Sequence, residues 1–228
     1  MFRRASTISQ ALVLAALVAS LGEICRGEKA EVSDAAYTKV ITERADKIVA
    51  ALGIADSGTT ARVRGLIVQH YRSLREIHDA RNAKVDDAKN SPGGDPTVAS
   101  AWIKVARDSA DLKLIEVHRR FVAHLLVELT PEQIDILKDA MTYGVVPITY
   151  KRYLELLPNL KEEEKREILA TLREAREHAM DAGSSEEKHA LFGKHKGRIN
   201  NYLSSAGYDM KRAEKDLAAK EKAATLNR

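Results

Sequence analysis

The sequence predicts an all-α fold, and three observations support this prediction. Apolar residues recur at three- and four-residue steps through most of the chain after residue 33, which is the period of an amphipathic helix. No segment shows the period-two alternation of a half-buried strand. Glycine and proline stand mainly in short breaks between the periodic stretches. We therefore expect one bundle-like domain of about six to eight helices over residues 28–228, after a cleaved N-terminal signal peptide at residues 1–27.

The signal peptide is predicted from the order of three features. Arg3 and Arg4 give a positive start, residues 11–21 are apolar and uncharged, and Cys25-Arg26-Gly27 offers small residues for cleavage after Gly27. The apolar run is too short to span the roughly 30 Å of a bilayer core. A short buried helix and a lipoprotein anchored at Cys25 are the alternatives. We expect an exported protein, periplasmic or extracellular, without a transmembrane segment in the mature chain.

Removal of residues 1–27 changes the charge and the cysteine content. It takes away three arginines and one glutamate, so the formal net charge falls from +4 to +2. Lysine and arginine then alternate with acidic residues rather than forming the concentrated basic face that nucleic acids require. The single cysteine leaves with the signal peptide, so the mature chain forms no disulfide. We expect no nucleic-acid partner.

The first half of the mature chain is expected to hold three long helices. Ser33 is a candidate cap for the first, and Gly53 ends it. The second begins near Ser57 or Thr59 and fades through the charged residues 81–89. Prolines and glycines in residues 90–96 break the chain before a third helix over residues 97–129.

The second half is expected to hold shorter helices. Thr130 and Gln133 form a capping box with Pro131 at the first helical position. Residues 144–149 are interpreted as an apolar connector because Pro147 disfavours a helix. Further helices are expected over residues 149–157, 161–182 and 185–206, the last opened by a Ser184 and Glu187 capping box. Residues 209–228 should form a helical tail whose apolar stripe is thin and which can fray.

The helix predicted over residues 185–206 has two unlike faces. One face should point to the core and contains Leu191, Phe192, His195, Ile199, Tyr202 and Leu203. The opposite face contains Ala190, Gly193, Gly197, Asn201 and Ser204. Each glycine inside a helix costs about 1 kcal/mol relative to alanine. Either a second helix crosses closely at this face, or a ligand lies against the bare backbone.

Histidine and carboxylate pairs do not predict a metal site or a cofactor. Glu186 and His189, and Glu174 and His178, share helical faces, but a di-iron bundle needs two Glu-x-x-His pairs and two more glutamates. The mature chain has neither a cysteine nor a Gly-x-Ser-x-Gly nucleophile motif. Whether the protein is an enzyme stays open, and a glycan-acting enzyme would use His178 or His189 as acid or base.

Tyrosines cluster in two places. The first group surrounds the apolar connector and consists of Tyr143, Tyr150 and Tyr153. In the second, Tyr202 and Tyr208 accompany Arg198, Asn200 and Asn201. Sugars stack on aromatic rings while planar polar groups pair with their hydroxyls. Bracing of helix contacts by tyrosines is the alternative interpretation.

Four strings in the chain resemble the bacterial domain-of-unknown-function family 3826. They are Leu129-Thr-Pro-Glu-Gln133, Met141 to Pro147, Glu174 to Ser185, and Gly193 to Tyr202 followed by Ala206 to Asp209. The resemblance implies an exported bacterial protein and carbohydrate binding, with no catalytic residue to carry over. A shorter resemblance links Leu129 to Gln133 with the Leu-Thr-x-x-Gln motif of periplasmic stress chaperones, which usually carry it twice.

Our leading hypothesis is an exported helical protein that binds carbohydrate or assists polysaccharide processing. A periplasmic chaperone and a polysaccharide-acting enzyme are the alternatives. The predicted ligand-binding residues come from the polar, glycine-containing second half of the chain: His178, Asp181, His189, Gly193, Gly197, Arg198, Asn200, Asn201, Tyr202 and Tyr208.

Overall fold

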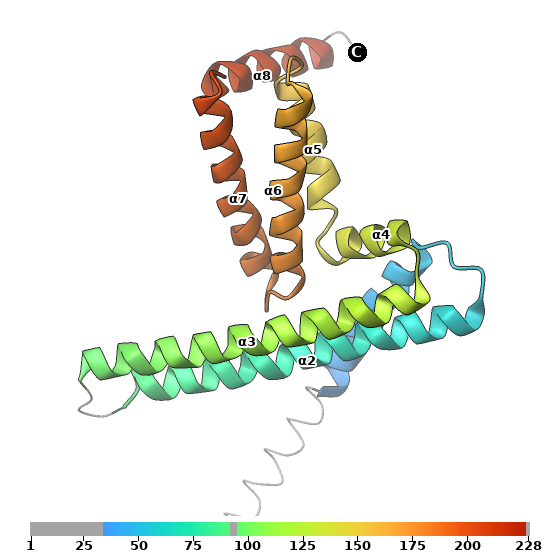
Figure 1. Ribbon diagram of the computed structural model, residues 1–228, viewed down its shortest axis with the longest axis vertical. Helices are drawn as coiled ribbons and strands as arrows, with labels where there is room; N and C mark the ends of the chain where they lie inside the picture. Colours follow the sequence, from blue (N-terminus) through green and yellow to red (C-terminus); the bar gives the residue numbers. More distant parts are fainter. Residues whose placement is uncertain (1–33, 92–94, 227–228) are drawn as a thin grey trace, which may run out of the picture. The chain divides into compact units, whose positions relative to one another are not determined.

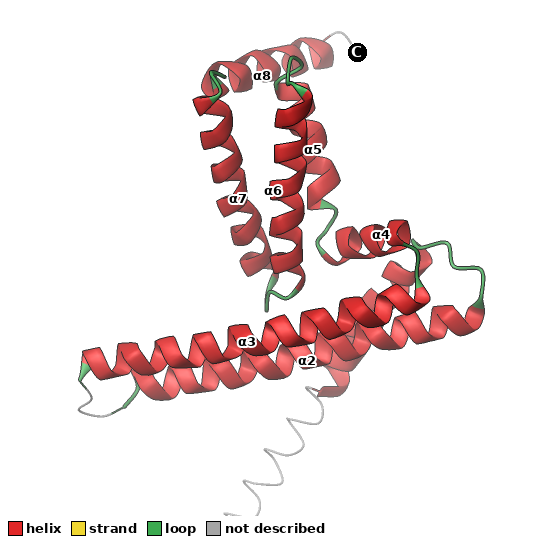
Figure 2. Cartoon of the chain, viewed as in Figure 1, coloured by secondary structure: helices red, strands yellow, loops and turns green. Residues whose placement is uncertain are grey.

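The computed structural model describes residues 34–91 and 95–226, and every regular element within these ranges is a helix (Figures 1 and 2). This confirms the predicted all-α fold. The signal peptide, Cys25, Ser33 and part of the predicted break at residues 90–96 lie outside the described residues. The chain divides into two compact units, Met1–Asp46 and Lys47–Arg228. Residues 34–50 are helical, and all further elements belong to the second unit.

Two helices of equal length, α2 (Ser57–Lys89) and α3 (Pro96–Glu128), lie side by side as an antiparallel hairpin (Figure 1). Asp56 caps α2 by accepting a hydrogen bond from the Thr59 amide, and Asp95 caps α3 in the same way. The charged end of α2 is fully helical, so the predicted fading after residue 81 does not interrupt it. The hairpin buries Val63, Ile67, Leu74, Phe121 and Leu125.

The helices α4 (Pro131–Met141) and α5 (Val145–Leu156) follow. The predicted capping box is confirmed, because Thr130 Oγ1 accepts from the Gln133 amide and Gln133 Oε1 accepts from the Thr130 amide. The predicted connector at residues 144–149 is wrong, since α5 starts at Val145 and includes Pro147. Proline is tolerated there because the first-turn amides of a helix have no intrahelical partner.

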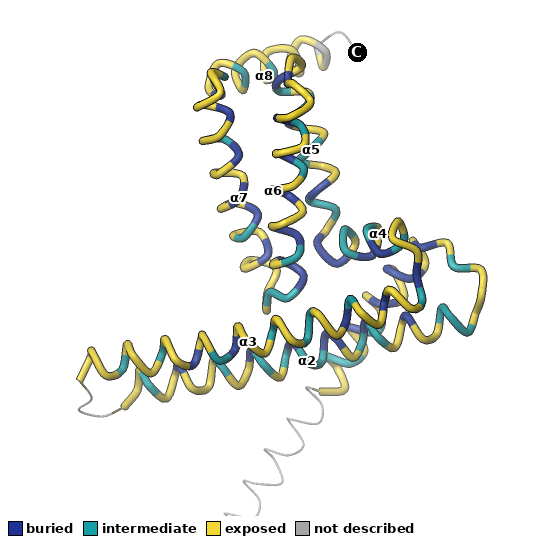
Figure 3. Tube along the Cα trace, in the orientation of Figure 1, coloured by how far each residue is buried: buried dark blue, intermediate teal, exposed yellow. Residues whose placement is uncertain are grey.

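The remaining helices are α6 (Glu162–Met180), α7 (Ser185–Ser205) and α8 (Met210–Leu226). They pack with α5 around one apolar core, visible as the dark positions of α5, α6 and α7 in Figure 3. The core residues are Val146, Tyr153, Leu157, Leu160, Ile168, Leu172, Ala175, Ala179, Phe192, Ile199, Leu203 and Met210. Tyr202, which we placed on the core face of α7, is exposed instead.

Only half of the capping box predicted for α7 is present. Ser184 Oγ accepts a hydrogen bond from the Glu187 amide at 3.1 Å, as expected. The Glu187 carboxylate, however, accepts from the Gly183 amide at 2.8 Å rather than from the Ser184 amide. Glu187 therefore fixes the turn between α6 and α7 one residue earlier than the standard motif.

Candidate functional site

The end of α6 is joined to the α2–α3 hairpin by a cluster of ionisable side chains around Asp181. The Asp181 carboxylate lies between two histidines, with Oδ1 3.2 Å from His70 Nε2 of α2 and Oδ2 2.8 Å from His118 Nδ1 of α3. The Asp181 carbonyl oxygen is 2.7 Å from His78 Nε2, which donates to it when that nitrogen carries the proton. Three helices therefore meet at one residue, which we call the centre of the Asp181 network.

The network extends to a second carboxylate. His118 Nε2 lies 3.3 Å from Glu177 Oε2, and Lys138 Nζ of α4 donates to the same oxygen at 2.6 Å. Charges of opposite sign thus alternate from Asp181 through His118 and Glu177 to Lys138. Such an arrangement offsets the desolvation that each buried charge would otherwise suffer.

The electrostatics separate the two histidines that contact Asp181. Contact with Asp181, followed by contact with Glu177, raises the pKa of His118 to about 9, although burial opposes the shift. Burial lowers the pKa of His70, whose side chain is 1% exposed and whose ring stacks on Phe121 at 4.0 Å. At neutral pH the site therefore contains a cationic His118 and a neutral His70.

Both carboxylates stay ionised. Burial alone would raise the pKa of Asp181, but its contacts with His118 and His70 hold that pKa below the ordinary value. Burial also opposes ionisation of Glu177, and contacts with His118 and Lys138 outweigh it and lower the pKa of Glu177 to about 2. Histidines of α2 and α3 surround the Asp181 carboxylate and neutralise its charge. We therefore interpret the network as a structural link between the end of α6 and the α2–α3 hairpin.

Gly183 is closely packed beside this network. A Cβ atom at residue 183 would lie 3.0 Å from His78 Cγ, 3.1 Å from Cδ2 and 3.2 Å from Glu187 Oε2. These distances are shorter than ordinary van der Waals contacts, so a side chain here would require His78 or Glu187 to shift by a few tenths of an ångström. Glycine therefore lets the turn between α6 and α7 approach the ring of His78 closely.

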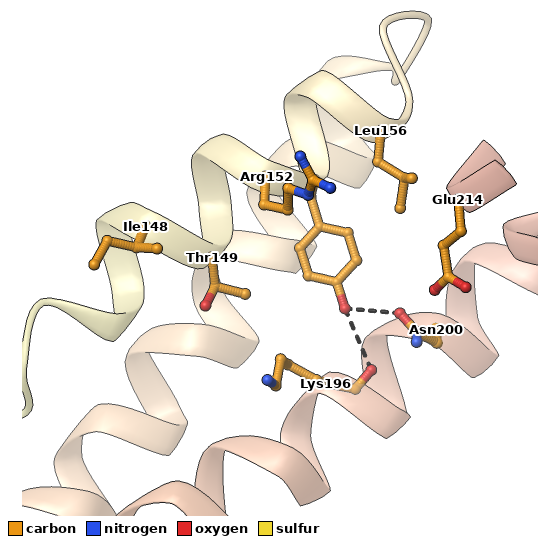
Figure 4. Close-up of a pocket in the computed structure, with 8 residues that line it drawn as sticks. Ile148, Thr149, Arg152, Leu156, Lys196, Asn200 and Glu214 are labelled. Carbon is orange, nitrogen blue, oxygen red and sulfur yellow. Dashed lines mark hydrogen bonds between the residues drawn. The ribbon is translucent and has the colours of Figure 1, made fainter. Parts of the chain in front are cut away.

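A separate groove lies between α5, α7 and α8 and has a volume of about 530 Å³ (Figure 4). We call it the α5–α7 groove. Its lining residues are Ile148, Thr149, Arg152, Tyr153, Leu156, Lys196, Asn200 and Glu214. The buried Tyr153 donates its hydroxyl hydrogen to Asn200 Oδ1 at 2.7 Å, with the Lys196 carbonyl oxygen 3.4 Å away. Burial, and to a lesser degree Glu214, raises the pKa of Tyr153 to about 12, so the phenol stays protonated.

Gly193 and Gly197 of α7 lie on the same helical face as Lys196 and Asn200. Counted from Gly193, the other three residues follow at three, four and seven positions. A Cβ atom at Gly193 or Gly197 would meet no described atom within 4 Å. The close helix crossing that we considered at these glycines is therefore wrong within the described residues. The other explanation, a ligand against bare backbone, stays a prediction.

The turn between α4 and α5, which contacts the start of α7, has a strained backbone. Tyr143 adopts φ +60° and Gly144 adopts φ +65° between α4 and α5. A left-handed conformation is unfavourable for a residue with a Cβ atom. The Tyr143 ring stacks on His189 of α7 with centroids 5.7 Å apart and planes inclined by 15°. Both side chains are exposed and extend the polar face that contains Gly193 and Asn200.

The family model described as "Protein of unknown function (DUF3826)" matches residues 38–223. The chain belongs to this family. No curated protein matches the chain. This match confirms the family resemblance that the sequence indicates, and the description of the family names no function.

The structure divides the predicted ligand-binding residues of this DUF3826 protein among several surfaces. His189, Gly193, Gly197 and Asn200 share the α7 face beside the α5–α7 groove. His178 and Asp181 line a second cavity, between the α2–α3 hairpin and the start of α7. Asn201 lies on an exposed part of α7 and lines neither cavity.

The remaining members make contacts of their own. Arg198 Nη1 forms an ion pair with Glu174 at 3.0 Å. The Tyr208 hydroxyl donates to Glu164 Oε2 at 2.6 Å and so holds the turn before α8 against the start of α6. Tyr202 is 38% exposed. The structure therefore does not collect the tyrosine, asparagine and arginine residues from 198 to 208 into one cavity.

Sequence reasoning missed the residues that form the Asp181 network. In the sequence His70 and His78 stand among the apolar positions of one helical stripe, as ordinary core histidines do, and His118, Glu177 and Lys138 follow no distinguishing pattern. Tyr153 and Asn200 were singled out, but as members of two different clusters. Among the described residues, no group of histidine, cysteine and carboxylate side chains is arranged to hold a metal ion.

Proposed function

We propose that this protein binds carbohydrate in the α5–α7 groove. The observation that supports the proposal is the pair of helix-interior glycines, Gly193 and Gly197, beside the Tyr153–Asn200 hydrogen bond. Open space over both glycines leaves the backbone of α7 accessible to a flat ligand. The same face presents an amide, and the facing helix presents a hydroxyl at Thr149.

The chemistry of the groove favours a neutral, hydroxyl-rich ligand. Its charged lining groups are of both signs, with Arg152 and Lys196 opposed by Glu214. Figure 4 shows the side chain of Glu214 in α8 extending toward Asn200. The groove therefore offers a carboxylate acceptor and an amide group close to each other. Ile148 is 66% exposed at the same groove and offers apolar surface to a sugar ring. Few placed polar groups on a partly apolar wall are typical of small-ligand sites.

Calorimetry of the purified protein against neutral oligosaccharides of plant and bacterial origin tests this proposal. We expect binding that Gly197→Leu abolishes, because the leucine side chain would fill the open space over α7. Gly65→Leu is the matched control, since Gly65 also lies inside a helix, α2, with no described atom within 4 Å of its Cβ position. Absence of heat with every sugar at millimolar concentration, or equal loss in both variants, would contradict the proposal.

The same panel separates binding from catalysis. Release of new reducing ends would indicate an enzyme, and His189→Ala and His178→Ala would show which of the two histidines the reaction requires. Binding without turnover would support a non-catalytic role in polysaccharide processing.

A chaperone activity is the second candidate, and an exposed stripe on α3 supports it. Val98, Trp102, Val105 and Leu112 follow one another at helical spacing, and each is more than half exposed. Contiguous exposed apolar surface is characteristic of sites that bind other proteins. Trp102→Ser should weaken suppression of client aggregation while Ile148→Ser, an equally exposed apolar residue in the groove, should not. Full activity in Trp102→Ser would exclude this stripe.

We further propose that the protein is exported after cleavage near Gly27, as the order of charge, apolar run and small residues in residues 1–27 supports. Within the described ranges, no helix combines the length and apolar character needed to cross a bilayer. The intact mass of the protein purified from its native host tests the cleavage. A mass that retains residues 1–27 would contradict export by this route.

A further inference from the structure

The second cavity, which we call the Asp181 pocket, has a volume of about 640 Å³ and is lined by residues of α2, α3 and α7 and of the end of α6. It is built differently from the α5–α7 groove. Every polar side chain that lines it is ionisable, and the rest of its wall is aliphatic, with Leu114, Ile115 and Leu191 as the large residues. None of the described residues that line it has a hydroxyl or amide side chain. This lining favours a charged ligand with an aliphatic body over a sugar.

Most charges at the Asp181 pocket are already neutralised by protein groups. Asp181 contacts His118 at 2.8 Å, and Arg81 lies 3.5 Å from Glu187. Two lining charges differ from these, because Asp111 of α3 and Lys194 of α7 have no ion pair or hydrogen bond with any described side chain. They have opposite signs and come from different helices of the same cavity.

We propose that the Asp181 pocket binds a small zwitterion with an aliphatic body, namely a free aliphatic α-amino acid. The ligand ammonium pairs with Asp111, the ligand carboxylate pairs with Lys194, and the ligand side chain packs on Leu114, Ile115 and Leu191. The cavity volume is within the range of roughly 300–1,000 Å³ usual for small-molecule sites. A ligand with only one charge leaves either Asp111 or Lys194 unpaired, and this provides the selectivity.

Calorimetry with leucine and two of its derivatives tests the charge requirement. N-acetyl-leucine lacks the ammonium, and leucinamide lacks the carboxylate. We expect leucine to bind to the purified protein and each derivative to bind up to about 5-fold more weakly, because Asp111 and Lys194 are exposed and solvent screens their ion pairs. Equal affinity for all three, or no heat from leucine, valine and isoleucine at millimolar concentration, would overturn the proposal.

Two variants assign the partners. Asp111→Asn should weaken leucine up to about 5-fold and should not weaken N-acetyl-leucine, because that derivative has no ammonium to pair with Asp111. Lys194→Gln should weaken leucine and leave leucinamide unchanged. Lys196→Gln is the matched control, since Lys196 is also an exposed lysine of α7 but lines the α5–α7 groove.

The test is independent of the carbohydrate proposal. Asp111 and Lys194 do not line the α5–α7 groove, and Gly197 and Asn200 do not line the Asp181 pocket. Both variant positions are exposed, so the thermal midpoint of each variant should match that of the parent protein. The proposal would also be overturned if the Asp111 and Lys194 variants changed the affinities for N-acetyl-leucine and leucinamide in the same way.

Discussion

The α5–α7 groove and the Asp181 pocket share α7 and differ in how their walls are held. The Asp181 pocket is held by buried charges that pair across three helices, and Gly183 is tightly packed against His78 beside it. In the α5–α7 groove the Tyr153 hydroxyl bridges α5 and α7 above their shared apolar core, and open space lies over Gly193 and Gly197. The comparison teaches that glycine in one short region serves two purposes, close approach at residue 183 and accessible backbone along α7.

The largest effect should come from removal of the central carboxylate. Asp181→Ala leaves the cationic His118 paired with Glu177 alone and removes the acceptor facing His70. Breaking a buried ionic network from one side typically costs about 3–5 kcal/mol. Urea unfolding followed by circular dichroism measures the loss.

The control for this prediction is Asp111→Ala. Asp111 is an exposed aspartate at the same pocket with no ion pair among the described residues, so its loss should change the unfolding free energy by less than about 0.5 kcal/mol. Equal losses in the two variants would mean that the Asp181 network does not hold the hairpin to α6.

The second prediction concerns pH. The pKa of His118 is raised from 6.5 to about 9 in the folded protein, so the protonated form is favoured by folding. The associated stability is fully present below pH 6.5 and is lost as pH rises toward 9, with a total on the order of 3 kcal/mol.

Unfolding free energies measured between pH 6 and pH 9.5 test this slope. His118→Gln should be less stable than the parent protein at pH 6 and should show a flatter profile above it. An unchanged slope in His118→Gln would assign the loss to another group.

The third prediction contrasts two glycines. Gly183→Ala should destabilise the protein by about 1–3 kcal/mol, because the new methyl group would overlap the ring of His78. Gly193→Ala should stabilise it by up to about 1 kcal/mol, because the methyl group meets open space inside a helix.

The opposite signs are the informative result, and thermal unfolding of both variants measures them. Destabilisation by Gly193→Ala would mean that this face of α7 is covered in the native protein. Such a result would remove the accessible backbone on which the carbohydrate proposal depends.

The smallest effect is expected at the α5–α7 groove. Tyr153→Phe removes the hydrogen that Asn200 Oδ1 accepts and should cost about 1 kcal/mol. The loss is limited because Asn200 is only partly buried, so water can replace the phenol. Urea unfolding measures it, and a cost near that of Asp181→Ala would show that the groove is as structural as the Asp181 network.

Much of the fold could be predicted from the sequence, because local signals determine where a helix begins and ends. Thr130 with Gln133 gave the start of α4, and Ser184 gave the start of α7. Pro147 misled the prediction because the sequence around it does not show whether the proline lies inside a helix, where it is unfavourable, or in the first turn, where it is tolerated. In the structure, Gly144 adopts a left-handed conformation and α5 begins at the next residue, which places Pro147 in the first turn.

The candidate site was predictable only in part. Glycine spacing identified the face of α7 beside the α5–α7 groove, since two glycines in a helix are unusual whatever surrounds them. The joining of Tyr153 to Asn200 depends on how α5 and α7 are placed across the core, and no local pattern encodes that.

Patterns among neighbouring residues predict an all-α protein, most helix boundaries, membership of the family and an unusual glycine-containing face on α7. Periodicity and capping are properties of neighbouring residues, so they can be read along the chain. The packing of the helices brings His70, His78 and His118 together at Asp181. It also places Gly183 against His78 and leaves open space over Gly193 and Gly197. Those relations join residues from separate helices, and the pKa of each group is determined by the charges that packing places beside it.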